Sequence, residues 1–493
     1  MRLILWCLFL VLCVGVVQGP WLGQGPNGFH KWRESDTAAV AANLAFEEFD
    51  LLRPRVDQRG MGNGITGMEF PLYNSGVALL WRTFGYSHLW ARLLSLASLL
   101  VLSVALGRLT LHLGQNLKIL KKESNDWAMA AVFAVCFAPL GFFYSQKIQP
   151  DMLGLACSIL GFLFFVQGEQ RTSFRGPFLL AGALFLALAG LIKPTFLVVG
   201  APMAVFLVQR HGIGALARTR NVAVAASALA PVFGWLYYAR WLSESEGNSH
   251  FYLGGDGVSE LSAAVTGPFY QNVFLTWPWE LQAGFILSPF ALAGIYQLRR
   301  HKIGSLLGVW IAGCLLIFIL TAQHCATSHD YYGLPMVPPL AMAGGYGIVA
   351  AYRWVNAGTR RSFATRMAVF AAFLALAIPT AFLRVSGRYG ESFDFAAGRK
   401  LFDHMIPKDA RVLAIDDTPS VLLYRSGRKG LNLMPHQVSS ELIAQYRYLV
   451  SFERFEKSAQ ENVKRVGNLK FLFRNQGIAA YRLTPQNHQS MNQ

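Results

Sequence analysis

Two acidic residues at the ends of apolar segments are the side chains most able to do chemistry in this chain. Asp36 lies in Arg33-Glu34-Ser35-Asp36-Thr37, directly after the first apolar run, and Asp151 ends Gln149-Pro150-Asp151 between two later runs. A carboxylate can accept a proton from an attacking hydroxyl or amine. Each could instead cap a helix, because Asp accepts hydrogen bonds from the free N–H groups of a first helical turn. The two interpretations are compatible, and both stay open at this point.

Other polar and aromatic side chains could hold a phosphate or a sugar. A compact ammonium can stabilise a departing phosphate, and tyrosine and histidine offer both ring faces and hydrogen bonds. The simpler interpretations are lysines that extend to the membrane surface and solvated loops. The candidate substrate-binding residues are Arg33, Glu34, Glu69, Lys147, Lys193, His329, Asp330, Tyr331 and Tyr332.

Metal and nucleotide sites have weaker support. His324, Cys325, His329 and Asp330 are metal-binding residue types, but no second group of ligands follows at a useful spacing. No phosphate-binding glycine loop, nucleophile elbow or dinucleotide motif is present. We therefore expect no metal ligand set and no obligatory cofactor, and a divalent metal stays open as an addition.

The composition predicts the elements that must position these residues. Of the 493 residues, 53% are hydrophobic and 14% are charged, whereas about a quarter of the residues are charged in a soluble domain. Several uncharged runs approach the roughly 20 residues that cross a bilayer. We expect a polytopic α-helical membrane protein with about eleven transmembrane helices. The expected spans lie near 3–19, 86–106, 127–144, 150–167, 176–191, 195–209, 221–241, 281–298, 304–322, 332–352 and 366–384.

The positions of the basic residues predict the orientation of these spans. Lys118, Lys121 and Lys122 share one loop, and every second loop after it is also rich in Lys or Arg. Such loops are normally cytoplasmic. The net charge of +17 therefore indicates orientation in a plasma (inner) membrane rather than a nucleic-acid partner. A retained first helix would place the N-terminus in the cytoplasm and all the polar motifs on the outer face.

The chain divides by composition into a membrane domain, 1–385, and a tail, 386–493. Within the first external loop, residues at about 36–52 have the spacing of an amphipathic helix at the membrane interface, with Ser35 or Asp36 as its N-cap. The tail alternates strand-like segments, 411–415, 448–452, 470–473 and 479–481, with helix-like ones, 419–425 and 455–466. We expect a small external α/β domain there.

Five motifs follow one another along the chain: Glu34-Ser35-Asp36, Glu69-Phe70-Pro71-Leu72, Ala91-Arg92-Leu93-Leu94-Ser95, Gln149-Pro150-Asp151 and His329-Asp330-Tyr331-Tyr332. In this order, they resemble the motifs of the GT-C membrane glycosyltransferases, in particular the bacterial branch similar to protein O-mannosyltransferases and aminoarabinose transferases. The resemblance covers about residues 1–385. Family members often carry Lys beside the proline that matches Pro71, where this chain has Phe70, so no particular sugar is assigned.

The resemblance implies transfer of a sugar from a polyprenyl-phosphate donor to a glycan, lipid or protein acceptor at the outer face, with inversion. By position, Asp36 matches the family's catalytic acidic residue, and Asp151 resembles the second acidic position. These two carboxylates are expected to frame one external cavity. The main alternative is a transporter or flippase for polyprenyl-linked lipids, which would also place ionisable residues in a membrane cavity. A structural or sensory membrane protein is a third class.

Overall fold

The computed structural model describes residues 1–116, 124–171, 175–248, 261–327, 329–356, 363–390, 392–418, 420–464 and 467–485. Its contacts divide the chain into two compact units. The first contains Met1–Leu22, Arg92–Tyr238 and Leu253–Arg388, and the second contains Gly23–Ala91, Ala239–Tyr252 and Tyr389–Gln493. The second unit therefore joins the long loop after the first apolar helix to the C-terminal tail. The expected domain boundary at residue 385 stays a prediction.

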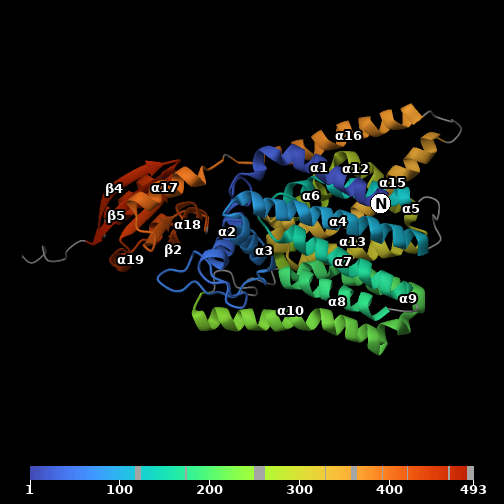
Figure 1. Cartoon of the computed structure of the whole chain (residues 1–493), viewed down its shortest axis with the longest axis horizontal. Helices are drawn as coiled ribbons and strands as arrows, with labels where there is room; N and C mark the ends of the chain where they lie inside the picture. Colours follow the sequence, from blue (N-terminus) through green and yellow to red (C-terminus); the bar gives the residue numbers. More distant parts are fainter. Residues whose placement is uncertain are drawn as a thin grey trace, which may run out of the picture. The chain divides into compact units, whose positions relative to one another are not determined.

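Helices build the first unit, and the long ones lie roughly parallel to one another (Figure 1). α7 packs along α8, and α15 packs along both α12 and α5. A Cβ atom on Gly294 of α12 would lie 1.9 Å from the carbonyl oxygen of Ala343 on α15. Small residues that permit such close approach are typical of membrane helix bundles.

The helical elements from the N-terminus to the end of this unit are α1 (Arg2–Leu22), α4 (His88–Asn116), α5 (Ser124–Phe137), α6 (Pro139–Tyr144), α7 (Asp151–Gln170), α8 (Arg175–Ile192), η1 (Pro194–Val199), α9 (Gly200–His211), η2 (Ile213–Ala217), α10 (Thr219–Glu246), η3 (Leu261–Val265), α11 (Gly267–Tyr270), η4 (Gln271–Gln282), α12 (Gly284–Leu298), α13 (Lys302–Leu320), α14 (Ala322–Ala326), η5 (Asp330–Met336), α15 (Val337–Asn356) and α16 (Phe363–Ser386). Of these, α4 and α10 extend into the second unit.

The apolar helices confirm a polytopic membrane protein but not the count of eleven spans. Among the described residues, seven helices are long and apolar enough to cross a membrane, and the pair Gly267–Gln282 and Gly284–Leu298, bent by 106°, is an eighth candidate. The expected span 127–144 is divided at Pro139. The expected span 195–209 is divided between the short helix η1, which starts at Pro194, and helix α9. Proline lacks the N–H that a continuing helix needs. Lys118, Lys121 and Lys122 lie outside the described residues.

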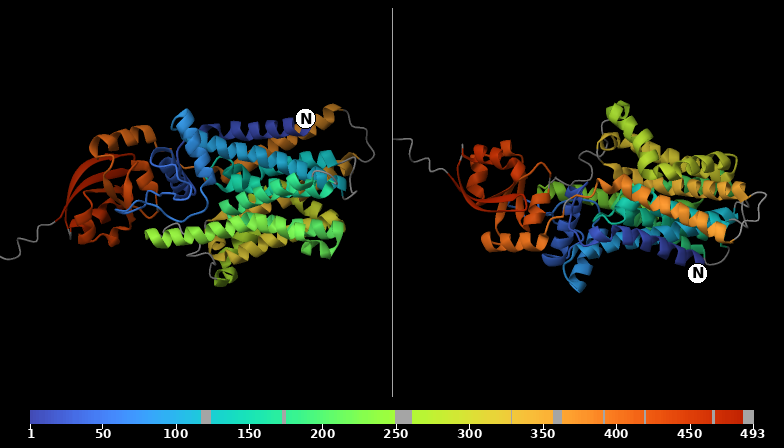
Figure 2. Two further views of the ribbon diagram at one scale, coloured as in Figure 1. Left: turned by 60° about the horizontal axis from the view of Figure 1, so that its bottom comes forward. Right: turned by 90° about the horizontal axis from the view of Figure 1, so that it is seen from above.

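A five-stranded sheet organises the C-terminal part of the second unit (Figure 2). The strand order is β2-β1-β3-β5-β4; β1 pairs in parallel with β2 and β3, and β5 pairs antiparallel with β3 and β4. Buried side chains from the sheet, α19 and α20 form its core. The elements of this unit are α2 (Lys31–Phe46), α3 (Leu72–Phe84), α17 (Phe395–Met405), β1 (Arg411–Ile415), α18 (Val421–Ser426), β2 (Lys429–Leu433), η6 (Pro435–Gln437), α19 (Ser440–Gln445), β3 (Tyr448–Phe452), α20 (Glu453–Lys464), β4 (Gly467–Asn475) and β5 (Ile478–Pro485).

The expected α/β tail is confirmed, and β1 and β3 have the predicted bounds. The prediction missed β2, whose residues Lys429–Leu433 include a glycine and lack β-branched side chains. Gly430 is required there, because a Cβ atom at this position would lie 1.9 Å from the carbonyl oxygen of Val412 in β1. Pairing with β1 therefore determines this strand, and local propensity does not.

Candidate active site

Asp36 lies inside helix α2, in its second turn, and is not a helix cap. The N-cap is His30, in a left-handed conformation with φ of 61°, and α2 begins at Lys31. The expectation of Ser35 or Asp36 as the N-cap is therefore wrong. Residues 31–35 contain neither Pro nor Gly, so the helix can extend toward the N-terminus as far as the turn at Gly28 and His30.

Helix α2 is also not the interfacial helix expected at about 36–52. It ends at Phe46, and all residues from 34 to 41 are buried, which is more than two complete turns. An interfacial helix would leave its polar face exposed. Here α3 and α18 pack against α2. The carboxylate of Asp36 is thus enclosed by protein, with a side chain that is 1% exposed.

Among the described residues, the surroundings of Asp36 satisfy only part of its carboxylate. Ser420 Oγ lies 3.5 Å from Oδ1, at the limit of hydrogen-bond length. Oδ2 accepts no hydrogen bond from any described residue, and Arg33 Nη1 lies 3.8 Å from it. The Arg33 guanidinium donates instead to Glu69 Oε1. Arg33 is therefore placed between two carboxylates and donates a hydrogen bond to Glu69.

This arrangement has an electrostatic consequence. Burial raises the pKa of Asp36 to about 7, against the opposing effect of Arg33, and the negative charges of Glu69 and Asp57 contribute to the rise. A carboxyl group with such a pKa exchanges a proton near neutral pH, as a general base requires. Of the other candidates on this helix, Glu34 is fully buried, and its Oε2 accepts a hydrogen bond from the Asn27 backbone N–H at 3.3 Å.

In the first unit, Asp151 and Lys193 form a direct ion pair. Lys193 Nζ lies 2.7 Å from Asp151 Oδ1 and is 4.0 Å from the ring centroid of Tyr331 and 4.9 Å from that of Tyr332. Asp151 is the first residue of α7, and Pro150 is the N-cap, so the capping interpretation of Asp151 is not supported by a cap hydrogen bond. Four of the predicted site residues therefore share one cluster, with the ammonium held between a carboxylate and two aromatic faces.

Asp330 belongs to a second group in the same unit. Its Oδ1 accepts a hydrogen bond from the Tyr144 hydroxyl at 2.6 Å, and its Oδ2 accepts one from the Arg388 guanidinium. The rings of Tyr144 and Tyr331 lie 6.3 Å apart, which connects the two groups. Lys147 is fully buried, and its Nζ lies 4.8 Å from the ring centroid of Phe143. Arg388 Cζ lies 5.7 Å from the centroid of the same ring.

His329 lies at the edge of these groups. Its Nδ1 is 2.8 Å from Thr327 Oγ1, and its ring lies 5.1 Å from that of His324 and 5.6 Å from that of Tyr331. Among the described residues, no three His, Cys, Asp or Glu side chains are grouped as a metal site would require. The geometry of His329 suits hydrogen bonding and ring contact.

The second unit also holds a cavity of about 530 Å³ with aromatic and cationic walls. Tyr86, His88, Phe395 and Arg399 line it, and Asp36 does not. Arg399 lies 5.1 Å from the Tyr86 ring centroid and donates to the Tyr424 carbonyl at 2.9 Å. Aromatic faces beside hydrogen-bond donors are able to hold a polar ligand such as a sugar.

No protein-family model matches the chain, and no curated protein sequence matches it. Solved structures do match it. Apo ArnT from Cupriavidus metallidurans superimposes with a TM-score of 0.65 at 14% identity, over 96% of this chain and 97% of that one. The chain has the GT-C fold. ArnT bound to undecaprenyl phosphate gives a TM-score of 0.61 at 14% identity, over 96% of this chain and 98% of that one.

Two further GT-C structures are similar over almost the whole chain. The oligosaccharyltransferase AglB from Archaeoglobus fulgidus, in complex with an inhibitory peptide and a dolichol-phosphate, has a TM-score of 0.58 at 11% identity and covers 99% of this chain and 75% of its own. The mycobacterial arabinofuranosyltransferase AftD has a TM-score of 0.59 at 12% identity and covers 99% of this chain but 40% of its own. The likeness thus includes the second unit.

Sequence reasoning missed three side chains that this GT-C fold brings to the candidate residues: Ser420 beside Asp36, and Tyr144 and Arg388 beside Asp330. Ser420 carries no sequence signal, since it lies 384 residues after its partner. Arg388 offered a weak signal, because a cation just beyond the last apolar segment often pairs with an acidic group.

Two basic residues of the tail, Arg428 and Lys429 at the start of β2, have acidic partners of their own. Lys429 Nζ lies 2.6 Å from Asp57 Oδ1 and 3.4 Å from Glu47 Oε1, and Arg428 Nη2 lies 2.9 Å from Asp403 Oδ1. Although burial opposes it, the charge and hydrogen bond of Lys429 hold the pKa of Asp57 below its usual value. Lys429 therefore connects β2 to the loop after α2, and Arg428, just before β2, pairs with α17.

Proposed function

We propose that this protein is a membrane glycosyltransferase that moves a sugar from a polyprenyl-phosphate donor to a glycan, lipid or protein acceptor. The observation that carries the proposal is the enclosed Asp36 carboxylate, in a chain with the GT-C fold. One of its oxygens accepts no hydrogen bond from the residues that the structure describes, and its pKa is raised to about 7. The solved structures of ArnT with undecaprenyl phosphate and AglB with a dolichol-phosphate support the donor class.

In this mechanism, Asp36 is the general base. The hydroxyl or amine of the acceptor attacks the anomeric carbon of the sugar from the side opposite the phosphate. The new bond to the acceptor forms as the bond from the anomeric carbon to the phosphate oxygen breaks, so the configuration inverts. The acceptor proton passes to Asp36 Oδ2, the oxygen that accepts no hydrogen bond within the described chain, and the polyprenyl phosphate leaves with the electron pair.

The departing phosphate requires positive charge. We assign this role to Lys193, whose ammonium is held by Asp151 and by the faces of Tyr331 and Tyr332. Asp151 is then a positioning residue that fixes Lys193. Fixed charges that stabilise a developing anion typically contribute about 10²- to 10³-fold to the rate. A single phosphate leaves, so lysine can supply this charge without an obligatory metal, and transfer assays with and without EDTA test that point.

The same proposal includes the orientation of the protein in the membrane. The N-terminus is cytoplasmic, and the second unit with its sheet lies outside an inner membrane, so that transfer takes place at the outer face. The placement of Arg and Lys in alternate loops supports this arrangement. A reporter enzyme that is active only outside the cytoplasm, fused after residue 493, should be active. Activity only from a fusion at the N-terminus would contradict the orientation.

The experiment that tests the function is a donor panel. The full-length protein in nanodiscs is incubated with polyprenyl-phosphate sugars and a membrane extract as the source of acceptors, and the loss of each donor is followed by mass spectrometry. The proposal predicts consumption of one donor or a few related ones, with release of polyprenyl phosphate. If folded protein consumes none of a broad panel but moves a polyprenyl-linked lipid across liposomes, the protein is a flippase.

A further inference from the structure

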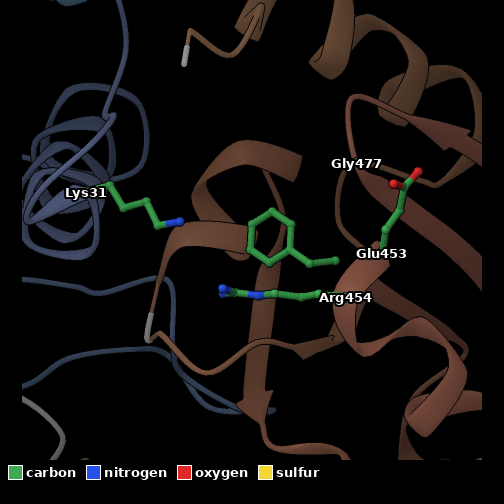
Figure 3. Close-up of a pocket in the computed structure, with 5 residues that line it drawn as sticks. Lys31, Glu453, Arg454 and Gly477 are labelled. Atoms are coloured by element: carbon green, nitrogen blue, oxygen red, sulfur yellow. The ribbon is translucent and has the colours of Figure 1, made fainter. Parts of the chain in front are cut away.

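Three cationic side chains surround one aromatic ring in the second unit. The ring centroid of Phe452 lies 5.8 Å from Lys31 Nζ, 5.7 Å from Arg425 Cζ and 5.6 Å from Arg454 Cζ. These residues come from three separate helices, α2, α18 and α20, and Phe452 is the last residue of β3. Figure 3 shows the charged ends of Lys31 and Arg454 directed toward the same space. We call these three cations and the ring the Phe452 cluster.

The positive charges of the cluster exceed the nearby negative ones. Arg454 Nη2 lies 3.2 Å from Asp416 Oδ1 and also contacts Asp417. In the described part of the chain, the side chains of Lys31 and Arg425 make no ion pair and no hydrogen bond. Three cations thus face two carboxylates. Burial, together with the charges of Arg425 and Arg454, lowers the pKa of Lys31, as expected when cations gather without enough anions.

An open cavity lies beside two of these cations, Lys31 and Arg454, and Arg425 is not part of its lining. The cavity has a volume of about 220 Å³ and is lined by Lys31, Phe452, Glu453, Arg454 and Gly477. The carboxylate of Glu453 points away from the two cations in Figure 3 and lies 3.5 Å from Arg474 Nε, so it does not neutralise them.

Two helices add to the positive potential at this cavity. Helix α2, with 16 residues, begins at Lys31, and helix α20, with 12 residues, begins at Glu453; both residues line the cavity. The N-terminus of a helix carries the positive end of its dipole and favours anions. The field of both helices therefore has the same sign as the field of the Phe452 cluster.

We propose that the Phe452 cluster is a binding site for a phosphate group, carried either by a small soluble compound or by a lipid headgroup. Phosphate fits the arrangement better than a carboxylate because its several oxygens can accept from both cations that line the cavity, Lys31 and Arg454, while the charge of Arg425 lies on the same Phe452 ring. Guanidinium groups bind phosphate through paired hydrogen bonds, and an ammonium binds it as a point charge. This site makes no use of Asp36 and does not depend on the glycosyl-transfer chemistry.

The test measures phosphate binding directly on the full-length protein in detergent. Inorganic phosphate is followed by equilibrium dialysis, and water-soluble dihexanoyl phosphatidic acid is followed by native mass spectrometry against dihexanoyl phosphatidylcholine. The proteins are the wild type, Lys31→Met, Arg425→Leu and the charge-preserving Arg425→Lys. Lys457→Met, at an exposed position on α20 away from the cavity lining, is the matched control.

We expect saturable binding that weakens at least tenfold in Lys31→Met and Arg425→Leu, stays unchanged in Lys457→Met and is largely retained in Arg425→Lys. Binding of inorganic phosphate identifies a soluble source, and binding of phosphatidic acid alone identifies a lipid headgroup. No binding in either arm overturns the proposal, as does equal binding by the wild type and Lys31→Met. Because Lys31 is only half-buried, that variant decides the question if Arg425→Leu does not fold.

Discussion

The hydroxyl of Ser420 lies 3.5 Å from Oδ1 of Asp36, so a residue of the C-terminal segment completes the surroundings of a carboxylate in the first loop. Ser420 has a φ of 67°, which is uncommon for a residue other than glycine. Such conformations persist where the surrounding structure imposes them, and they concentrate at functional sites. The interaction lowers the pKa of Asp36, in opposition to burial, which raises it.

Removal of this hydroxyl should move the titration of Asp36 upward. Without the hydrogen bond from Ser420, the ionised form is less favoured, so the acidic midpoint of the pH–rate profile rises by less than about one unit in Ser420→Ala and Ser420→Gly. Glycine tolerates the left-handed backbone, so Ser420→Gly alone should also raise the melting temperature. An unchanged midpoint in both variants would separate Ser420 from Asp36 in function.

The rate of transfer should depend on pH through Asp36. As a base it must be ionised, and its pKa is raised to about 7, so kcat/KM should rise about tenfold per pH unit below that value and level off above it. Glu69→Gln removes a negative neighbour that raises this pKa, so the midpoint should fall in that variant. A flat profile between about pH 5.5 and 8 would argue against a titrating base at position 36.

Loss of the Lys193 ammonium should slow transfer without affecting insertion into the membrane. Lys193→Met removes the cation assigned to the departing phosphate, and we expect kcat to fall about 10²- to 10³-fold. Asp151→Asn should have a smaller effect, because the ammonium remains but loses its partner at 2.7 Å. Lys302→Met, at an exposed position of the same unit, is the control. Equal kinetics in Lys193→Met and Lys302→Met would return Lys193 to a structural role.

The pair of Lys429 and Asp57 should stabilise the second unit. Lys429→Met removes the nearer cation of the buried Asp57 carboxylate and leaves Arg59 Nη2, at 4.0 Å from Oδ1. Loss of one partner of a buried pair costs on the order of 3 kcal/mol, and the charge of Arg59 reduces that cost. We expect a lower melting temperature, partly restored by a second change, Asp57→Asn. The pKa of Asp57 is lowered in the folded protein. The stabilisation is therefore fully present above the usual pKa of an aspartate, and it is lost as the pH falls from that value through the lowered pKa of the folded state. Exposed Lys408, replaced by Met, is the comparison.

The apolar runs were readable from the sequence because burial in a bilayer needs long segments of one composition, and a helix must satisfy its own backbone there. The ends of these helices could not be predicted, because prolines such as Pro139 and Pro194 divide helices without changing the composition of the segment. In the tail, β1 and β3 were readable as apolar strands. β2 could not be predicted, because its position depends on partners elsewhere in the sequence: Gly430 pairs with Val412, and Lys429 pairs with Asp57.

The candidate site was predictable as residue types and not as contacts. Asp36, Asp151 and Lys193 stood out because ionisable side chains at the ends of apolar segments are costly unless they have a role. The pairing of Asp151 with Lys193, 42 residues apart, and of Asp330 with Arg388, 58 residues apart, depends on helix packing. The position of Asp36 within α2 was misjudged because the helix start is set by the turn at His30.

The role of Asp36 as the general base is tested by the single-turnover rate of sugar transfer in Asp36→Asn, measured beside the wild type and the control Asp50→Asn in the same loop. Asn has the shape of Asp and can keep the contact with Ser420, but it cannot take a proton. Loss of a general base typically costs about 10²- to 10⁴-fold in rate, so we expect a fall of that size for Asp36→Asn, with Asp50→Asn at the wild-type rate. Transfer by Asp36→Asn at the wild-type rate would contradict that role.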